Sequence, residues 1–522
     1  MTKHLFFAIG LLSLAMACNS SQKTVSEPVQ APKSMDNSAT FAKTITEAEL
    51  KDHLYTYASD EYEGRETGKP GQKKAAAYIK EQYRKLGIPA AKNDGDYLQN
   101  VPLEISGLPT GSINLNDTEF TMGEHVLTFS ALTGVYDTIV YVGYGIEYGN
   151  YSDYKGLDVR DKIVLVKLGE PINEDGTYDF SGSSKKSFWS KMYESLQKRI
   201  DLASEKGAKA LLYYDQNNFA RFKNQFDTKK KRGGDKMGLK KKENDALTTL
   251  FIDADFAKGI LPNIEESHLP QKLAAAIDFK IIDSSEEVNS ENVVAVLKGS
   301  EKPDEYVVIS SHLDHIGITA DGEINNGADD DGSGTVALLE IAEAFKKAAD
   351  AGMGPKRSIV FLHVTGEEKG LLGSQYYTDV DPIFPLEETV ANLNIDMIGR
   401  IDPKREGARN YIYLIGSDKL SADLHQLSEI VNLKYMNIEL DYTYNDDNDP
   451  NRFYYRSDHY NFAKNNIPII FYFNGTHADY HRPSDTPDKI NYDLLQNRSR
   501  LIFHTAWEIA NRDERIVVDK AK

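Results

Sequence analysis

The 522-residue sequence contains a single cysteine, Cys18, so the chain cannot form a disulfide within itself. Its formal net charge of -19 at pH 7 argues against nucleic acid as a partner. The sequence has no internal repeat, and no segment beyond the amino terminus is apolar enough to cross a membrane. A chain of 522 residues is too long for one ordinary domain, so we expect two structural units and a tail.

The amino terminus has the features of an export signal. An apolar run over residues 5–14 follows Lys3 and is too short to span a bilayer. Residues 14–18 resemble the lipobox of bacterial lipoproteins, which ends at the cysteine that receives the lipid. We therefore expect residues 1–18 to be a lipoprotein signal peptide and a lipidated Cys18 to anchor the protein to the cell envelope, on the periplasmic or outer-membrane face. Secretion is the alternative if Cys18 is not lipidated.

Composition divides the rest of the chain. Residues 19–40 are rich in Ser, Pro, Gln and Lys, which predicts a disordered tether. Residues 41–125 and 288–522 are expected to form one domain, and residues 126–287, with short β-rich runs broken by glycines, an inserted β-rich domain. The basic stretch over residues 223–242 is expected to be a solvated loop.

Strand and helix patterns alternate after Asn292, which predicts an α/β fold with a mixed, largely parallel sheet and helices on both faces. The predicted strands are 293–297, 306–311, 358–364, 390–395, 411–415 and 467–473. The predicted helices begin at Thr46, Pro70, Thr335 and Ala422.

Ionisable residues follow four of these strands, where each strand ends. The carboxyl ends of parallel strands meet at one edge of a sheet, which is where ligands bind in open α/β folds. A single ionisable residue after a strand more often caps a helix or lies in a surface turn. Ionisable residues after four strands of one sheet instead favour a functional site. The residues are His312 and Asp314, Glu367 and Glu368, Asp396, and His481.

These side chains suit zinc, which takes imidazole and carboxylate ligands. Two zinc ions that share one carboxylate need two terminal histidines, two terminal carboxylates and one bridging aspartate. The residues above, with one aspartate of the 329–331 triplet, supply that set. Glu367 is then left over as a carboxylate that can take a proton from water.

The motifs of this region resemble those of the M28 family of zinc metallopeptidases. They are His-Leu-Asp (312–314), Gly-Ala-Asp-Asp-Asp-Gly-Ser-Gly (327–334), Gly-Glu-Glu (366–368), Asn-Ile-Asp-Met-Ile-Gly (394–399), Arg-Ser-Asp-His (456–459) and Tyr-His-Arg-Pro-Ser-Asp-Thr (480–486). With a Glu-Gly-Arg-Glu-Thr-Gly loop (63–68) and an insertion that resembles a protease-associated domain, the resemblance covers nearly the whole mature chain.

The resemblance implies a role for each site residue. The terminal zinc ligands would be His312, Glu368, Asp396 and His481, with Asp330 as the bridge between two Zn2+ ions. Glu367 would be the general base, Asp314 would orient His312, Tyr480 would help to hold the oxyanion, and Arg456 would contact substrate. His315 is not expected to bind metal, because strand alternation would turn it away from His312 and the family does not use it.

The resemblance implies a di-zinc metallo-exopeptidase that acts on peptides. Release of amino-terminal residues is the favoured direction, because an acid-rich site can hold the α-ammonium group of the substrate. A carboxypeptidase of the same family is the alternative, since Arg400, Arg456 and Arg482 lie near the motifs. The family also includes glutaminyl cyclases, which use a single zinc, and inactive binding proteins, which lose ligands or the base.

Overall fold

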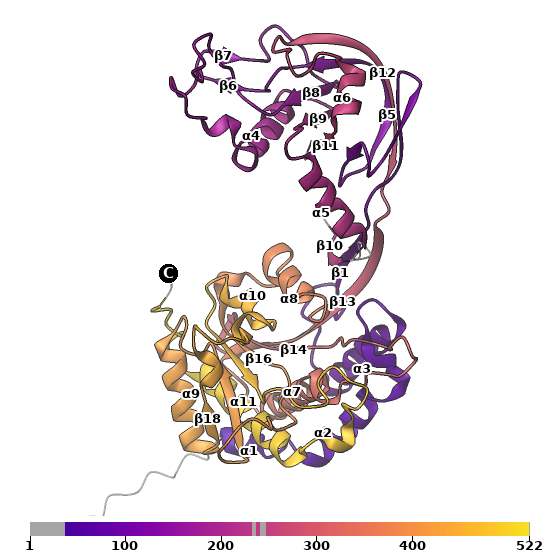
Figure 1. Ribbon diagram of the computed structural model, residues 1–522. Helices are drawn as coiled ribbons and strands as arrows, with labels where there is room; N and C mark the ends of the chain where they lie inside the picture. The colour runs from indigo at the N-terminus through magenta and orange to yellow at the C-terminus, as the bar shows by residue number, and fades with distance from the viewer. Residues whose placement is uncertain (1–36, 232–235, 241–246, 521–522) are drawn as a thin grey trace, which may run out of the picture.

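The computed structural model describes residues 37–231, 236–240 and 247–520, which form two lobes, each built around one large sheet (Figure 1). The predicted signal peptide, Cys18 and most of the predicted tether lie outside the described residues. Residues 37–40, predicted as the end of the tether, instead begin helix α1 (Asn37–Ala42). Ser38 is buried there, with its Oγ 2.6 Å from His504 Nδ1, so this segment is part of the folded domain.

The first sheet is mixed, as predicted. Its four central strands, β15, β14, β16 and β19, pair in parallel, whereas β10, β1, β13 and β15 pair with one another antiparallel. In spatial order the strands are β10 (Lys236–Leu239), β1 (Leu98–Ser106), β13 (Glu286–Leu297), β15 (Arg357–Val364), β14 (Lys302–His312), β16 (Thr389–Ile395), β19 (Ile469–Phe473), β17 (Tyr411–Ile415) and β18 (Glu439–Asp441).

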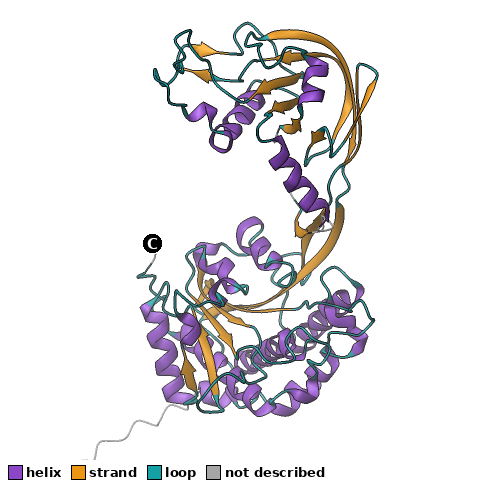
Figure 2. Cartoon of the chain, in the orientation of Figure 1, coloured by secondary structure: helices purple, strands orange, loops and turns teal. Residues whose placement is uncertain are grey.

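Helices cover both faces of this sheet (Figure 2). Successive strand residues belong to opposite faces, so Val307 and Ile309 lie in one apolar cluster and Val308 in another. The first cluster is completed by α2 (Glu47–Tyr57), α3 (Pro70–Leu86), α7 (Gly334–Asp350), α9 (Ala422–Tyr435) and α11 (Tyr492–Asn511). The second is completed by α10 (His459–Ala463) and by the segment after α8 (Leu372–Gln375).

Two of these helices form for reasons visible in the sequence. Thr46 caps α2, since its hydroxyl accepts the N–H of Glu49 and donates to that side chain. Helix α3 starts at Pro70 and ends before Gly87, which adopts a left-handed conformation with φ 68°. No helix among the described residues is both long and apolar enough to span a membrane.

The second lobe contains a sheet whose strands lie between Thr110 and Ile282, so its first strands precede the expected start of the insertion at residue 126. The exact limits of the inserted domain stay a prediction. In order the strands are β3 (Thr118–Thr121), β2 (Thr110–Leu115), β12 (Gln271–Ile282), β5 (Leu132–Tyr141), β8 (Ile163–Lys167), β9 (Ala210–Tyr214), β11 (Thr248–Ile252) and β4 (Val126–Leu127), with a separate pair β6 (Glu147–Tyr148) and β7 (Tyr151–Ser152).

Helices α4 (Met192–Glu205), α5 (Phe219–Lys231) and α6 (Ala254–Ile260) accompany the second sheet. The expectation of a solvated loop over the basic stretch is wrong for α5. Phe222 and Phe226, four residues apart, are buried and pack the helix onto the sheet, while the other residues of the helix, its lysines included, are partly or fully exposed. Beyond α5, β10 leaves the second lobe and joins the edge of the first sheet (Figure 1).

Candidate metal centre

The four central parallel strands of the first sheet bring the predicted residues together. His312 is the last residue of β14, and Asp396 directly follows β16. Glu367 and Glu368 lie in the loop after β15, and His481 lies in the loop after β19. The site therefore lies at the carboxyl edge of the parallel strands, where an open α/β sheet places its ligands.

The first group of ligand atoms surrounds His312. Its Nε2 lies 3.2 Å from Asp330 Oδ1 and 3.6 Å from Asp396 Oδ1. All three side chains are buried, and each offers a ligand atom within 4.8 Å of the others. One imidazole and two carboxylates at this spacing can hold a single cation.

The second group lies on the other side of Asp330. His481 Nε2 is 3.1 Å from Asp330 Oδ2 and 3.2 Å from Glu368 Oε2. Asp330 thus directs one carboxylate oxygen toward each group. This is the arrangement that a carboxylate needs in order to bridge two cations.

The neighbouring aspartates of the triplet have other partners. The carboxylate of Asp331 accepts the backbone N–H groups of His312, Gly334 and Met397 at 2.9 to 3.1 Å. Asp329 accepts the N–H of Gly399 at 2.7 Å and lies 3.1 Å from His477 Nε2. Because those carboxylates hold the surrounding backbone in place, Asp330 is the member of the triplet whose oxygens face the two groups.

The charges in the site favour a bound cation. Burial alone would lower the pKa of His312, but contacts with Asp330 and Asp396 raise this pKa well above its ordinary value. The pKa of His481 shifts in the same direction. Burial lowers this pKa, but the contacts with Asp330 and Glu368 together have the larger effect and raise it to about 10. The carboxylates therefore attract positive charge onto the imidazoles, and a metal ion would supply that charge in place of the protons.

Buried atoms without hydrogen-bond partners give a second test of whether zinc fits. Among the described residues, His312 Nε2 and Asp330 Oδ2 are buried and have only ion-pair neighbours, with no hydrogen-bond partner. A buried polar atom without a partner is costly, so such atoms call for a ligand. Imidazole nitrogens with carboxylate oxygens are a donor set that zinc accepts.

Asp314 contacts His312 through a different atom from the one predicted. His312 Nδ1 lies 3.0 Å from the backbone carbonyl oxygen of Asp314, whereas the Asp314 carboxylate is 4.0 Å away. That carboxylate accepts the hydroxyl of Thr67 at 2.6 Å and the N–H of Glu367 at 3.2 Å. The backbone of Asp314 therefore orients the imidazole, and its side chain serves the loop of Glu367.

The expectation that His315 would turn away from the site is wrong. Strand β14 ends at His312, so strand alternation does not extend to His315. Its Nδ1 lies 2.8 Å from Glu368 Oε1 and 3.8 Å from Asp330 Oδ2. His315 therefore belongs to the second group, beside His481. His459, in contrast, is buried with its Nε2 2.8 Å from the carbonyl oxygen of Tyr454, as expected of a packed residue.

A pocket with about 360 Å3 of empty volume opens onto the metal centre. It is lined by Asp330, Glu367, Asp396, His481 and Tyr480, by Arg456 and Thr476, and by the apolar side chains Met397, Phe453, Phe471 and Phe473. The Tyr480 ring stacks on His481 at 3.9 Å, and its hydroxyl lies 3.5 Å from Arg456 Nη2. Arg456 is exposed. Both residues thus line the pocket beside the proposed ligands.

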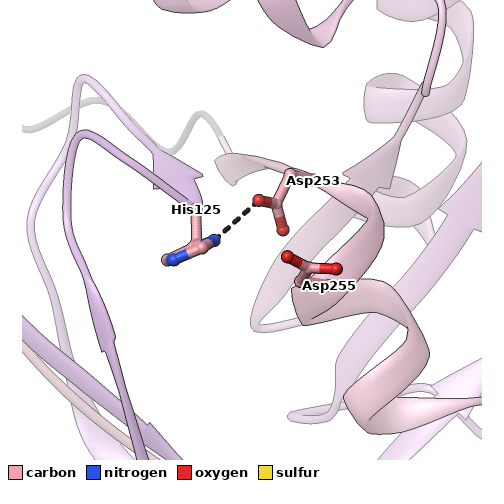
Figure 3. A group of neighbouring side chains, drawn as sticks. All are labelled: His125, Asp253 and Asp255. Carbon is pink, nitrogen blue, oxygen red and sulfur yellow. Dashed lines mark hydrogen bonds and ion pairs between the residues drawn. The ribbon is translucent and has the colours of Figure 1, made fainter.

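A different trio, His125, Asp253 and Asp255, lies on the second lobe (Figure 3). His125 Nδ1 is 2.7 Å from one oxygen of Asp253, and the other oxygen of Asp253 accepts the N–H of Phe256 as the cap of α6. Asp255 is exposed. Because Asp253 already has a partner at each oxygen, this trio is accounted for as a helix cap with a surface ion pair.

Three residues that support the centre received no role in the sequence analysis. Asp485 Oδ2 accepts the backbone N–H groups of Asp329 and Asp330 at 2.9 and 3.2 Å. Thr67 contacts Asp314, and Arg65 donates to the carbonyl oxygen of Asp330 at 3.3 Å. The only available signal was their presence in the two motifs over residues 63–68 and 480–486.

Residues 292–506 match the family model described as Peptidase family M28. These residues are an M28 peptidase domain. All the proposed ligands and Glu367 lie within the M28 domain. Thr67 and Arg65, which support its metal centre, come from the part of the chain that precedes it.

Two curated relatives and one solved structure show how this chain compares with named proteins. It is 36% identical over 106 residues to "Probable glutamate carboxypeptidase LAMP1" of Arabidopsis thaliana, which covers 20% of this chain and 14% of that protein. It is 27% identical over 279 residues to "probable leucine aminopeptidase 2" of Aspergillus oryzae, covering 48% and 50%. A zinc aminopeptidase structure from Bacillus subtilis aligns at 18% identity and TM-score 0.45, covering 92% and 99%. The chain therefore spans half or less of the length of either curated relative.

Proposed function

We propose that this chain is a zinc-dependent exopeptidase that holds two zinc ions and releases amino-terminal residues from peptides. The observation that carries the proposal is the carboxylate of Asp330, which directs one oxygen toward His312 and the other toward His481. Asp396 completes the first group, and Glu368 completes the second. The M28 match of this region supports peptide bonds as the substrate.

Zinc held by these residues would polarise the scissile carbonyl group and make water more acidic. Glu367 lines the same pocket, and burial raises its pKa well above the ordinary value. A carboxylate with a raised pKa is a stronger base, so Glu367 takes the proton of the attacking water and then donates it to the departing amine. Burial also raises the pKa of Tyr480, which keeps its hydroxyl protonated as a donor toward the oxyanion.

The lining of the pocket favours an aminopeptidase for residues with apolar side chains. The carboxylates that line the pocket, Asp330, Glu367 and Asp396, can attract the free α-ammonium group of a substrate. The same pocket is lined by the apolar side chains of Met397, Phe453, Phe471 and Phe473, which can contact an apolar side chain of the substrate. The leucine aminopeptidase named among the relatives agrees with this direction.

Carboxypeptidase activity is the second candidate, because the positively charged side chain of Arg456 lines the pocket. Arg456 could pair with the terminal carboxylate of a substrate, and its Nη2 is 3.5 Å from the Tyr480 hydroxyl. Peptides blocked at either end separate the two directions. An aminopeptidase cleaves the carboxyl-blocked peptide and spares the amino-blocked one, and the opposite pattern would make the enzyme a carboxypeptidase.

The substitution Glu367→Gln tests the proposed chemistry. It should lower kcat by about 10² to 10⁴-fold, because a general base commonly contributes that factor. Metal analysis should still find two zinc ions per chain, since Glu367 is not a proposed ligand. Glu406→Gln, at an exposed position of the same domain, is the matched control and should keep full activity. Wild-type activity in Glu367→Gln would remove its assignment, and a folded wild-type chain without zinc would favour a binding protein.

We propose, in addition, that the protein is attached to a membrane through lipid on Cys18. The apolar run before Cys18 and the absence of any other cysteine support this attachment. Mass spectrometry of the mature amino-terminal peptide tests it. An unmodified peptide that begins before or after Cys18 would show that the protein is not a lipoprotein.

A further inference from the structure

A turn from outside the M28 domain, residues 63–68, lies against the loops that carry the metal centre. Glu63, Gly64 and Arg65 have positive φ angles of 52°, 66° and 50°. A Cβ at Gly64 would lie 2.5 Å from the carbonyl oxygen of Gly317 and 2.6 Å from that of Asn325. Only glycine allows so close an approach, so this turn is built against the loop that precedes the aspartate triplet.

Arg65 ties the turn to the bridging aspartate. Its side chain is 1% exposed, and its guanidinium group lies 4.7 Å from the ring centre of Tyr57. The guanidinium donates to the carbonyl oxygens of Asn326, Gly327 and Asp330, at 2.6, 2.9 and 3.3 Å. A buried cation with this many partners holds the loop and the turn as one unit.

Thr67 extends this unit toward the proposed base. Thr67 is 1% exposed, and its hydroxyl donates to Asp314 Oδ2 at 2.6 Å. The other oxygen, Asp314 Oδ1, accepts the backbone N–H of Glu367 at 3.2 Å. Asp314 is completely buried, so each of these donors matters to its carboxylate. A continuous path of hydrogen bonds therefore runs from Thr67 through Asp314 to Glu367.

We propose that Thr67 is a positioning residue that sets the backbone of Glu367 through the carboxylate of Asp314. The proposal rests on the proposed function, in which Glu367 is the base. Without the Thr67 hydroxyl, the buried carboxylate is one donor short and turns toward a new partner, which releases the N–H of Glu367. A base displaced by a fraction of an ångström transfers protons poorly, although substrate still binds.

The test compares Thr67→Val with Thr67→Ser and with a control. Thr67→Val keeps the shape but removes the hydroxyl, and kcat should fall about 10 to 100-fold, as for other outer partners of metal sites. KM and zinc content should stay at the wild-type values. Thr67→Ser keeps the hydroxyl and should restore most of the lost kcat. Thr389→Val, at another buried threonine whose hydroxyl has no hydrogen-bond partner among the described residues, should change none of these values.

Hydrogen exchange gives a readout that does not depend on activity. In Thr67→Val, the amide of Glu367 should exchange faster than in the wild type, and in Thr67→Ser it should be protected again. An unchanged exchange rate in Thr67→Val would overturn the proposal, as would equal losses of kcat, zinc and thermal stability that Thr67→Ser does not repair. If the wild type cleaves no peptide, the proposed function fails, while the exchange rates still decide whether Thr67 holds Glu367.

Discussion

Each lobe contains four neighbouring parallel strands within a mixed sheet, but the two lobes use the carboxyl ends of these strands differently. Strands β5, β8, β9 and β11 of the second lobe are parallel neighbours, as are β15, β14, β16 and β19 of the first lobe. In the second lobe, Lys167 at the end of β8 donates to the carbonyl oxygens of Ile264 and Glu265, both at 2.8 Å. Asp215 after β9 accepts the backbone and side-chain N–H groups of Asn218.

In the first lobe, which contains the M28 domain and is called the M28 lobe here, several buried polar atoms at or near the strand ends have no hydrogen-bond partner in the described part of the chain. His312 Nε2, His315 Nε2 and Asp330 Oδ2 are buried without a hydrogen-bond partner among the described residues. The topology of the sheet therefore does not create the site. The polar atoms at a strand end can bind a metal ion when no neighbouring protein group forms hydrogen bonds with them. A bound ion then compensates for the cost of burying these atoms.

The largest effect is expected for Asp330→Asn, which tests this difference between the lobes. The amide keeps the size of the side chain but removes the charge shared by the two groups. Zinc content should fall and activity should drop by more than about 100-fold, which is the upper cost of losing an outer partner alone. Asp215→Asn, the same change at a strand end of the second lobe, is the matched control. Full zinc content and activity in Asp330→Asn would show that the carboxylate is not a bridge.

A smaller effect concerns His363, a buried histidine of the M28 sheet. Burial lowers the pKa of the His363 imidazole to about 3. As the pH falls, His363 of the unfolded chain therefore binds a proton near pH 6.5, whereas His363 of the folded chain does not. The free energy of unfolding should therefore fall as the pH drops below 6.5, by up to about 1.4 kcal/mol per pH unit. Replacing His363 with Gln removes this contribution to the slope.

Denaturant unfolding of the wild type and His363→Gln between pH 7.5 and 5 measures that slope. Both proteins are measured with a chelator, so that pH-dependent release of metal does not contribute. The variant should be less stable at neutral pH, because the imidazole contacts with Tyr83 and Ser311 are lost, but its stability should change less with pH. Equal slopes for both proteins would show that His363 does not resist protonation in the fold.

The smallest effect is expected for Asp253→Ala in the trio of Figure 3. The change removes the cap of α6 and should destabilise the second lobe by about 0.5 to 2 kcal/mol, as loss of a helix cap does. Zinc content and kcat should stay unchanged. A loss of bound metal in this variant would contradict the comparison, because the second lobe would then hold a metal site of its own.

The strands and the candidate ligands could be predicted because both depend on local sequence. Strand β17 has the predicted limits, helix α3 begins at the predicted Pro70, and each proposed ligand follows a strand end or lies in a short motif. The supporting contacts could not be predicted. Thr67 and Asp314 are 247 positions apart, and a threonine in a glycine-rich turn shows no sign of its distant partner. The same holds for β10, whose pairing with β1 is decided by tertiary packing.

His315 shows a different limit. The rule of strand alternation is sound, but it applies only as far as the strand continues, and the sequence does not show that β14 stops at His312. The composition predicts a loop over helix α5 because lysines are frequent in this segment. Composition gives no weight to the spacing of Phe222 and Phe226, the two buried phenylalanines that pack the helix onto the sheet.

The connection between the lobes bears on how such a chain is put together. Strands β1 and β13 pair antiparallel as far as Ile105 and Glu286, and the Ser284 hydroxyl donates to the carbonyl oxygen of Leu108 at 2.6 Å. The entire second lobe thus occupies the position of a β-hairpin turn. A tight turn could replace it with little change to this pair of strands, at the cost of β10, which now covers the edge of β1. The second lobe is therefore inserted between two paired strands of the first sheet and contributes β10 to the edge of that sheet.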